Sequence, residues 1–302
     1  GPGCPVCVTE KGFIDHAVLI GKKYDACIVT FGDLIRVPGT FGSLARFRSE
    51  GGKVRIIYSP MDCIEIATKM NPGPVVFLGV GFETTSPTIA ATLKTALMTD
   101  VRNLFVLPAF KTIHPPLRIL ASKLDLSGFL LPGHVSAIIG SDSYRYLADQ
   151  FGKPGVVAGF EALDILIAIR DLVRMASTGE ANIINDYRRV VRESGNIAAQ
   201  KLTQEVFEPC DATWRGLGVI SGSGLKFTDE YSRFNAATAF PVDVPEALDD
   251  PRCRCANILT GSLQPHRCGL FGKECTPEDP VGPCMVSSEG TCAAYYKYGT
   301  VN

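Results

Sequence analysis

Short runs of β-branched and other apolar residues alternate with longer segments of helical periodicity along the first two-thirds of the chain. Six apolar runs have the length and composition of buried strands. The expected strands are 26–31, 54–58, 75–80, 104–107, 128–131 and 155–158. Between them, apolar positions recur at intervals of three and four residues, which predicts helices. The expected helices are 62–69, 88–98, 115–123, 135–139 with 144–150, and 161–176.

This alternation predicts an α/β fold with mainly parallel sheets. Several strands end in Gly, Pro or Thr just before a helix, where α/β proteins usually bind ligands. We expect two α/β domains of ordinary size, 1–115 and 116–241, followed by a small domain over 242–302 that is rich in Pro, Gly and Cys. Within the second domain, 186–204 is expected to be a charged surface helix and 207–227 a Gly-rich strand or loop.

The composition excludes several classes of protein. Hydrophobic residues make up 46% and charged residues 20% of the 302 residues, as in an ordinary globular protein. The formal net charge of −1 gives no overall field to attract nucleic acid. No apolar run approaches the ~20 residues needed to span a membrane, and the start lacks a signal-peptide pattern. We therefore expect a cytoplasmic protein whose cysteines serve metal or redox chemistry.

Six of the eleven cysteines lie between Cys253 and Cys292. This stretch is too short and too rich in Gly and Pro to build its own hydrophobic core, so we expect a cross-link through metal or sulfur. Structural zinc sites usually use cysteines two to four residues apart, whereas wide, uneven spacing is typical of iron–sulfur ligation. Four of the six have the wide spacing C-x14-C-x6-C-x16-C: Cys253, Cys268, Cys275 and Cys292.

Cys255 and Cys284 lie in the same stretch but outside this quartet. Two interpretations stay open for them. They are disulfide partners that exchange electrons with a cluster, or they are small buried residues.

A second cysteine motif, GPGCPVC, stands at the amino end and contains Cys4 and Cys7. Two thiols at this spacing can close a disulfide, share a soft metal ion, or act as attacking and resolving thiols. A closed four-thiolate zinc site needs a second pair nearby, and Cys27 and Cys63 lie in a predicted strand and a predicted helix. We therefore favour redox chemistry or an open metal site.

Glu83, Thr84 and Thr85 follow a hydrophobic strand in the segment GVGFETTSP. A carboxylate and hydroxyls at a strand–helix junction can bind or orient a ligand. A purely structural alternative is a helix start, with Thr85 or Ser86 as N-cap and Pro87 in the first turn. Capping accounts for one hydroxyl but not for Glu83 together with both threonines, so we favour a site.

Two histidines occupy similar junctions. His134 follows Pro-Gly in the segment LPGHVS, and His114 precedes two prolines. A lone histidine is more often a structural hydrogen-bonding residue than a catalyst. The backbone beside His134 is fixed by its neighbours, which favours His134 over His114. His266 is two residues from Cys268 and is a candidate to support a cluster ligand.

Five motifs in register resemble the HypD family, the maturation factors of [NiFe] hydrogenases. The resemblance covers essentially the whole chain. The motifs are GPGCPVC at 1–7, GFETT at 81–85, PGHVSAIIG at 132–140, WRGLG at 214–218 and CTPEDPVGPCMVSSEGTCAAYYKY at 275–298.

The resemblance implies two α/β domains and a small iron–sulfur domain around a cleft. It implies a scaffold on which iron receives cyanide and carbon monoxide, giving Fe(CN)2CO, together with a HypC-type chaperone and a HypE-type cyanide donor. The C-x14-C-x6-C-x16-C cysteines are implied to hold a [4Fe-4S] cluster, with Cys4 and Cys7 in the redox-active cleft as a transient site for that iron.

Glu83, Thr84, Thr85 and His134 match family motif positions that line or approach the cleft. The family also has an earlier motif with a Cys and a His, so we expect an amino-terminal segment to precede this sequence. Two other functions stay open from the residues alone: an iron–sulfur thiol/disulfide oxidoreductase, and a zinc-stapled binding protein without redox activity.

Overall fold

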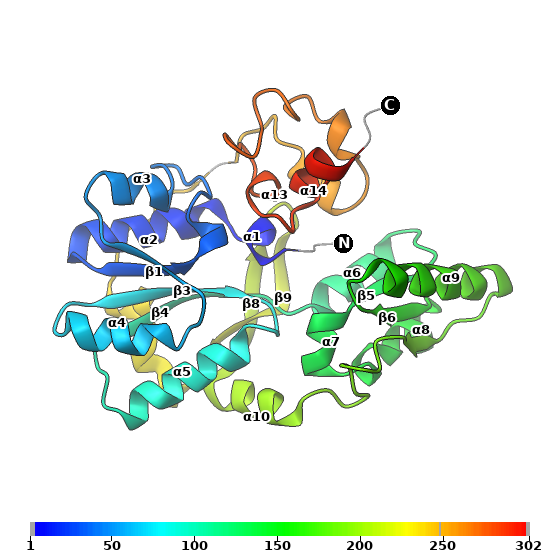
Figure 1. Cartoon of the computed structure of the whole chain (residues 1–302), viewed down its shortest axis with the longest axis horizontal. Helices are drawn as coiled ribbons and strands as arrows, with labels where there is room; N and C mark the ends of the chain where they lie inside the picture. Colours follow the sequence, from blue (N-terminus) through cyan, green and yellow to red (C-terminus); the bar gives the residue numbers. More distant parts are fainter. Residues whose placement is uncertain (1–3, 248, 300–302) are drawn as a thin grey trace.

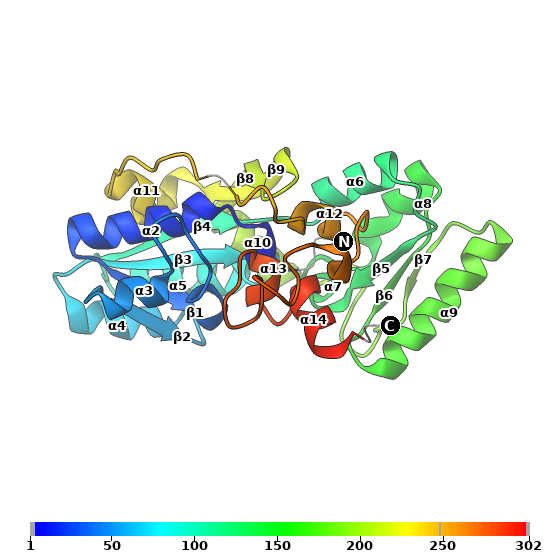
Figure 2. The ribbon, with the colours of Figure 1, turned by 90° about the horizontal axis from the view of Figure 1, so that it is seen from above.

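A computed structural model describes residues 4–247 and 249–299 (Figure 1). It contains a four-stranded sheet, a three-stranded sheet and a cysteine-rich segment that lies over the junction between them. The short helix α1 (Pro5–Val8) is at the same junction. Figure 2 shows the cysteine-rich segment between the two sheets from above. The predicted α/β class with mainly parallel sheets is confirmed.

The first sheet is entirely parallel, with strand order β2-β1-β3-β4. Its strands are β1 (Cys27–Phe31), β2 (Val54–Ile57), β3 (Val75–Gly81) and β4 (Leu104–Phe110). β3 is buried at every position because the sheet is covered on both faces. The chain leaves β1 and β3 toward opposite sides of the sheet. This order creates a crevice at their carboxyl ends, where α/β proteins bind ligands.

Alternate residues of the central strands pack on opposite faces of this sheet. Ile28 and Leu78 belong to one apolar core, and Val29 and Phe77 belong to the other. The elements of this region are α2 (Lys11–Tyr24), η1 (Gly32–Leu34), α3 (Leu44–Ser49), α4 (Asp62–Met70) and α5 (Ser86–Met98). None of the helices in the described ranges is long and apolar enough to cross a membrane.

The second sheet is parallel as well, in the order β5-β6-β7. Its strands are β5 (Phe129–Pro132), β6 (Gly155–Ala158) and β7 (Ile183–Asn185). Its core includes Leu117, Leu131, Leu147 and Val157. Its helices are α6 (His114–Lys123), α7 (Gly133–Ile139), η2 (Asp142–Tyr144), α8 (Arg145–Phe151) and α9 (Ala162–Thr178).

After β7 the chain returns to the first sheet. The returning elements are α10 (Ile197–Val206), β8 (Phe207–Trp214), β9 (Gly218–Phe227), η3 (Asp229–Phe234) and α11 (Ala236–Ala239). Phe207 and Phe234 share an apolar core with Phe77 of β3. This stretch lies within the predicted second domain but packs on the first sheet, and the three-domain division stays a prediction.

The expected helix over 186–204 is wrong in its first half, since the helix is only Ile197–Val206. Gly195 adopts a φ of 69°, and the Asn196 side chain accepts a hydrogen bond from the backbone N–H of Ala199. Together they start the helix at Ile197. The expected strand or loop over 207–227 is an antiparallel hairpin, β8–β9.

The cysteine-rich segment consists of short helices joined by turns. They are α12 (Cys255–Leu259), η4 (Pro265–Arg267), α13 (Pro283–Val286) and α14 (Thr291–Tyr298). In its described part, the only β pairing is an isolated bridge between Phe271 and Cys275. Its backbone hydrogen bonds are therefore local, within turns and short helices, and side-chain contacts join these pieces.

Candidate thiol site

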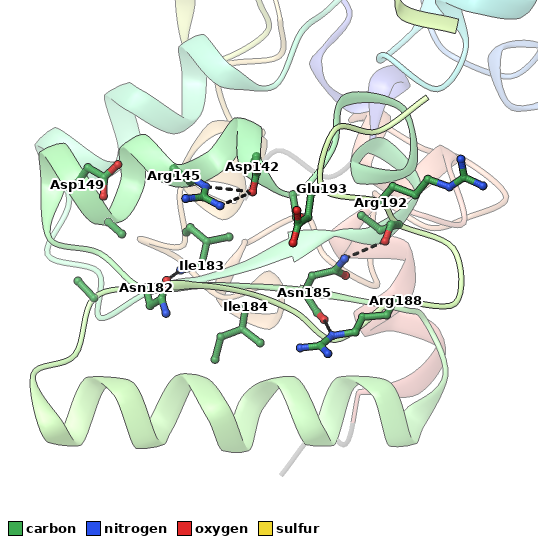
Figure 3. A pocket seen from close by; sticks show the side chains of 14 residues that line it. Asp142, Arg145, Asp149, Asn182, Ile183, Ile184, Asn185, Arg188, Arg192 and Glu193 are labelled. Carbon is green, nitrogen blue, oxygen red and sulfur yellow. Dashed lines mark hydrogen bonds and ion pairs between the residues drawn. The ribbon is translucent and has the colours of Figure 1, made fainter. Parts of the chain in front are cut away.

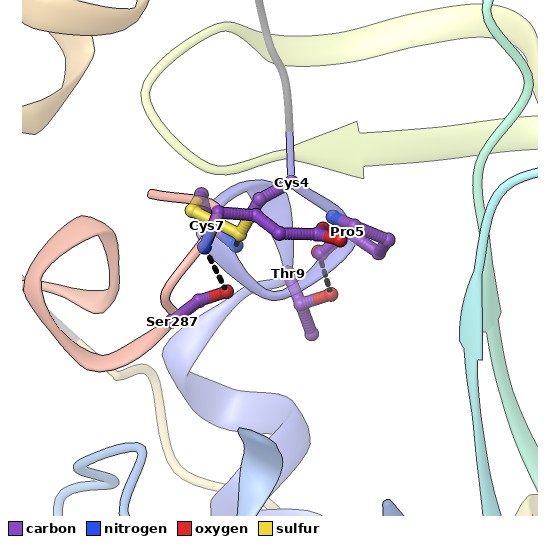
Figure 4. The surroundings of a disulfide bond; sticks show 6 residues. Cys4, Pro5, Cys7, Thr9 and Ser287 are labelled. Atoms are coloured by element: carbon purple, nitrogen blue, oxygen red, sulfur yellow. Dashed lines mark hydrogen bonds between the residues drawn. A yellow bond between two sulfur atoms is a disulfide. The ribbon is translucent and has the colours of Figure 1, made fainter. Parts of the chain in front are cut away.

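Cys4 and Cys7 form a disulfide at the start of α1 (Figure 4). Cys4 is the N-cap residue, and its sulfur accepts a hydrogen bond of 3.0 Å from the backbone N–H of Cys7. Pro5 occupies the first turn, where a missing N–H costs nothing. Both cysteines are buried. The pair is therefore held as a disulfide, one of the three states expected for it, and its redox role stays a prediction.

A cavity of about 160 Å³ adjoins this helix. Val6 of α1, Phe31 at the end of β1, Thr85 after β3 and Ser287 of the cysteine-rich segment line it. Figure 4 shows Ser287 beside Cys7. The carboxyl ends of β1 and β3 are where the strand order of the first sheet reverses. The cavity thus lies where this kind of sheet usually places a ligand.

Thr85 occupies the N-cap position of α5, as the structural alternative requires. Its side chain makes no capping hydrogen bond, so capping does not account for its hydroxyl. Thr84 is exposed. Of the two threonines, the structure brings only Thr85 to the cavity beside α1.

Glu83 is buried between the two α/β regions. Its Oε1 accepts a hydrogen bond of 2.8 Å from the backbone N–H of Ile113, while its Oε2 is buried without a partner among the described residues. Burial raises the pKa of Glu83 to about 7, and the hydrogen bond from Ile113 opposes part of that rise. A carboxyl group with this pKa can take up or release a proton at neutral pH.

His114 lies close to the same group. Its Nδ1 is 3.2 Å from the hydroxyl of Tyr146, and burial lowers its pKa to about 4, so the ring is neutral at pH 7. Burial raises the pKa of Tyr146 to about 12, with a further contribution from the charge of Glu83. Glu83 and His114 follow the adjacent strands β3 and β4. That adjacency is a signal for His114 that the order of the strands supplies.

His134 follows β5 and begins α7, and its side chain is exposed. Its ring centroid is 4.3 Å from that of Phe160, which follows the neighbouring strand β6. Among the interactions of the described residues, none joins His134 to Cys4, Cys7 or Glu83. Its place at the carboxyl edge of the second sheet is consistent with a ligand-facing role, which stays a prediction.

All six cysteines of the carboxyl-terminal segment line one cavity of about 20 Å³. The cysteines are Cys253, Cys255, Cys268, Cys275, Cys284 and Cys292. The remaining wall is largely apolar and includes Ile258, Leu270 and Phe271. His266 stacks on Tyr295 with ring centroids 5.4 Å apart and is not among the lining residues.

The chemistry of this cavity fits a thiolate-bound metal. Cys275 Sγ accepts a backbone hydrogen bond of 3.4 Å from Val281, the kind of contact that stabilises a sulfur ligand. A Cβ at Gly282 would lie 2.7 Å from Cys253 Sγ, so glycine is needed there for the sulfur to enter. In the described ranges, no three His, Cys, Asp or Glu side chains already stand in metal-binding positions. The assignment of the quartet as cluster ligands stays a prediction.

Cys255 and Cys284, the two cysteines outside that quartet, are both buried and line the same cavity. Their interaction lowers the pKa of Cys255 and, together with burial, raises the pKa of Cys284. A thiol pair and two small buried residues both fit this arrangement, so the two interpretations stay open.

A larger cavity of about 590 Å³ lies beside β7, away from the thiols (Figure 3). Acidic and basic side chains alternate around it, and Asp142 pairs with Arg145. None of the site residues expected from the sequence lines it. Size alone therefore does not locate the candidate site.

A disulfide at the crevice of a parallel sheet and a cavity lined by six cysteines define an α/β protein with two buried clusters of sulfur. A model of the HypD family, described as the hydrogenase formation hypA family, matches residues 1–299. The chain belongs to this family and is a hydrogenase maturation factor, so the resemblance found in the sequence is confirmed.

Individual relatives agree. The chain is 46% identical over 303 residues to hydrogenase maturation factor HypD of Escherichia coli strain K12, covering 99% of this chain and 81% of the relative. It is 40% identical over 308 residues to HypD of Azotobacter vinelandii, covering 99% and 81%. It is 42% identical over 301 residues to a putative hydrogenase expression/formation protein of Methanocaldococcus jannaschii, covering 99% and 83%.

Proposed function

We propose that this protein is the scaffold on which the iron of a [NiFe] hydrogenase receives cyanide and carbon monoxide, together with a HypC-type chaperone and a HypE-type cyanide donor. One observation carries the proposal. Helix α1, which holds the Cys4–Cys7 disulfide, packs against α13, which holds Cys284 (Figure 1). The helix that holds the disulfide and a helix that holds one of the six thiols are thereby packed against each other.

A single apolar core surrounds both sites. It includes Cys4 and Cys7 as well as Cys255 and Cys284. Water is excluded from such a core, so electrons and thiols can be exchanged within it without competing hydrolysis or oxidation.

The proposed redox step balances as follows. The Cys255 and Cys284 thiols transfer two electrons and two protons to the Cys4–Cys7 disulfide, whose S–S bond breaks while a Cys255–Cys284 disulfide forms. Restoring that pair takes two electrons and two protons. When bound by Cys253 and the other three quartet cysteines, a [4Fe-4S] cluster supplies electrons one at a time. A low-potential electron-carrier protein is the external reductant, and water supplies the protons.

The reduced Cys4 and Cys7 then serve the iron that is being modified. Each thiol loses a proton and becomes a soft thiolate ligand, which suits iron carrying cyanide and carbonyl groups. Thr85 lines the adjacent cavity and can donate a hydrogen bond to a ligand there. Glu83 precedes Thr85 by two residues, and with its pKa of about 7 it can accept protons at neutral pH.

The test compares Cys7→Ser with Cys210→Ser. Cys210 is a half-buried free cysteine on β8, outside both thiol sites. Each variant is purified anaerobically with the HypC-type chaperone, and its infrared spectrum is recorded. We expect Cys7→Ser to lose the cyanide and carbonyl bands and hydrogenase maturation, while keeping the fold and the visible absorption of the cluster. Cys210→Ser should retain all of them.

Normal maturation by Cys7→Ser would refute the role of the crevice. If the unmodified protein shows no cyanide or carbonyl bands yet exchanges thiols with an added disulfide, the oxidoreductase alternative is the correct one. The Cys4–Cys7 disulfide is the observation that keeps that alternative in view.

A further inference from the structure

The turn between β8 and β9 joins the two thiol sites. It carries the WRGLG motif, Trp214–Gly218, to which the proposed chemistry gives no role. The backbone N–H of Arg215 donates a hydrogen bond of 2.9 Å to the carbonyl of Val8, at the end of α1. The Trp214 ring lies 5.9 Å from the ring of Phe82 and its Nε1 donates to Ser223 Oγ at 2.7 Å. The turn is thus anchored beside the Cys4–Cys7 disulfide.

The other side of the turn meets the cysteine-rich segment. Gly216 has a φ of 76°, and a Cβ there would lie 2.5 Å from the Cβ of Ala256. Ala256 is the neighbour of Cys255 in α12. Only glycine lets the turn approach this helix so closely.

Arg215 itself is a buried cation. Its side chain is only 7% exposed, and it pairs with the half-exposed Asp249 through Nε, 3.0 Å from Oδ2, and through Nη2. Its Nη1 is buried without a hydrogen-bond partner in the described ranges. Among the lysines and arginines whose burial is described, only Arg215 and Lys111 are buried.

The Arg215 guanidinium, with Nη1 left without a hydrogen-bond partner in the described ranges, belongs to the turn that packs against Ala256, beside Cys255 of the thiol cavity. A buried cation costs free energy unless negative charge compensates it, and one partly exposed carboxylate provides only part of that compensation.

A cluster held by four thiolates carries negative charge. We infer that Arg215 is a positioning residue that supplies the buried positive charge for this thiolate-bound cluster and raises its reduction potential. The inference rests on the proposed function, because it requires the cluster. Reduction adds one electron, taken from the low-potential carrier, to an already negative group. A fixed cation nearby favours the reduced state.

The experiment is a redox titration of the purified protein with its cluster, followed by visible absorption and electron paramagnetic resonance. We expect Arg215→Gln to lower the ratio of reduced to oxidised cluster at a fixed solution potential by about tenfold, which is 59 mV for a one-electron couple. Arg254→Gln is the matched control. Arg254 lines the same cavity but is exposed, so water screens its charge and the shift should be much smaller.

Two further variants separate charge from structure. Asp249→Asn leaves Arg215 charged and removes the opposing carboxylate, so it should move the potential upward, opposite to Arg215→Gln. Arg215→Lys keeps the charge and loses the paired hydrogen bonds. It should therefore lower stability but leave the reduction potential of the cluster close to that of the unmodified protein. A purely structural role predicts that Arg215→Gln and Asp249→Asn shift the potential in the same direction or not at all.

Iron and sulfide analysis of every variant distinguishes a failure of the proposed function from a failure of the inference about Arg215. Absence of iron and sulfide from the unmodified protein would contradict the proposed function. Intact clusters with equal potentials in Arg215→Gln and Arg254→Gln would overturn the inference about Arg215 alone. If Arg215→Gln loses its cluster, the other two variants are decisive. A normal reduction potential in Arg215→Lys together with an upward shift in Asp249→Asn supports the inference. Any other result overturns it.

Discussion

The Cys4–Cys7 disulfide and the six-thiol cavity are both buried, but the chain holds them in different ways. The disulfide helix contacts β3 of the first sheet, in which Val75–Gly81 pairs along its whole length with Leu104–Phe110. The cysteine-rich segment has short helices, turns and, in its described part, one isolated bridge. The Cys4–Cys7 disulfide is attached to a region that a sheet and an apolar core already hold together. In the cysteine-rich segment, the cysteine side chains themselves form part of the core.

The difference predicts how each region responds to loss of a thiol. Backbone ladders and a large apolar core stabilise the first sheet whatever happens to its two cysteines. In the second region the cysteines themselves line the core, so under the proposed cluster their ligation and the folding of the segment are coupled. Loss of sulfur should therefore abolish function in the first region and structure in the second.

The largest effect is expected from Cys268→Ser. If Cys268 is a cluster ligand, its loss removes the cross-link from a segment with little other support. We expect bleached visible absorption, loss of iron, rapid proteolysis between about residues 250 and 299, and a loss of more than about 4 kcal/mol for the segment. Cys210→Ser is the matched control. An unchanged spectrum in Cys268→Ser would remove this residue from the ligand set and weaken the contrast between the two regions.

The next largest effect concerns pH and the Glu83–His114 region. The pKa of Glu83 is raised to about 7, so its contribution to stability is complete below the unfolded value of 4.5 and is lost as pH rises through about 7. The pKa of His114 is lowered to about 4, so its contribution is complete above the unfolded value of 6.5 and is lost as pH falls through about 4. The two pH dependences have opposite signs, and each changes the free energy of unfolding by up to about 3 kcal/mol.

Denaturant unfolding across this pH range separates the two groups. Relative to the unmodified protein, Glu83→Gln should become progressively more stable as pH rises from about 4.5 to about 7. His114→Asn should become progressively more stable, on the same comparison, as pH falls from about 6.5 to about 4. Both differences should persist in the Cys268→Ser background, because the first region does not depend on the cluster. Parallel stability curves would show that neither buried group titrates as proposed.

The smallest effect tests the contact between the two regions. Gly216 and Gly218 have φ values of 76° and 78°, but only a Cβ at Gly216 meets another residue, Ala256. Gly218→Ala should cost about 1 kcal/mol for its backbone conformation, and Gly216→Ala about 1–2 kcal/mol more for the clash. Thermal unfolding of the two variants measures the difference. Equal losses of stability in the two variants would mean that the contact between the turn and α12 does not contribute to the stability of the protein.

Much of the fold was predictable because buried parallel strands are nearly continuous apolar runs. The six expected strands correspond to β1 through β6, with differences of at most three residues at either end. β7 is only three residues long and half-buried, and it gave no such run. The helix expected over 186–204 failed because composition shows charge but not the left-handed backbone at Gly195.

The candidate site was predictable only in part. Motif spacing singled out the cysteines that the structure gathers in a disulfide and in one cavity. The hydrogen bond between Glu83 and Ile113 depends on β3 and β4 being neighbours, and the gathering of Cys255 and Cys284 in one cavity depends on the path of the turns. Neither relation follows from local sequence. The buried charge of Arg215 was equally hidden, because an arginine in a Gly-rich turn is usually solvated.

The return of the chain to the first sheet has a consequence for synthesis. The core around Phe77 includes Phe207 and Phe234, whereas the core of the second sheet draws on residues from Leu117 to Val191. On a ribosome that releases the chain from its amino end, the second sheet can therefore close before the first core is complete. The six sulfurs emerge after both, so the cysteine-rich segment meets neighbours that have already folded.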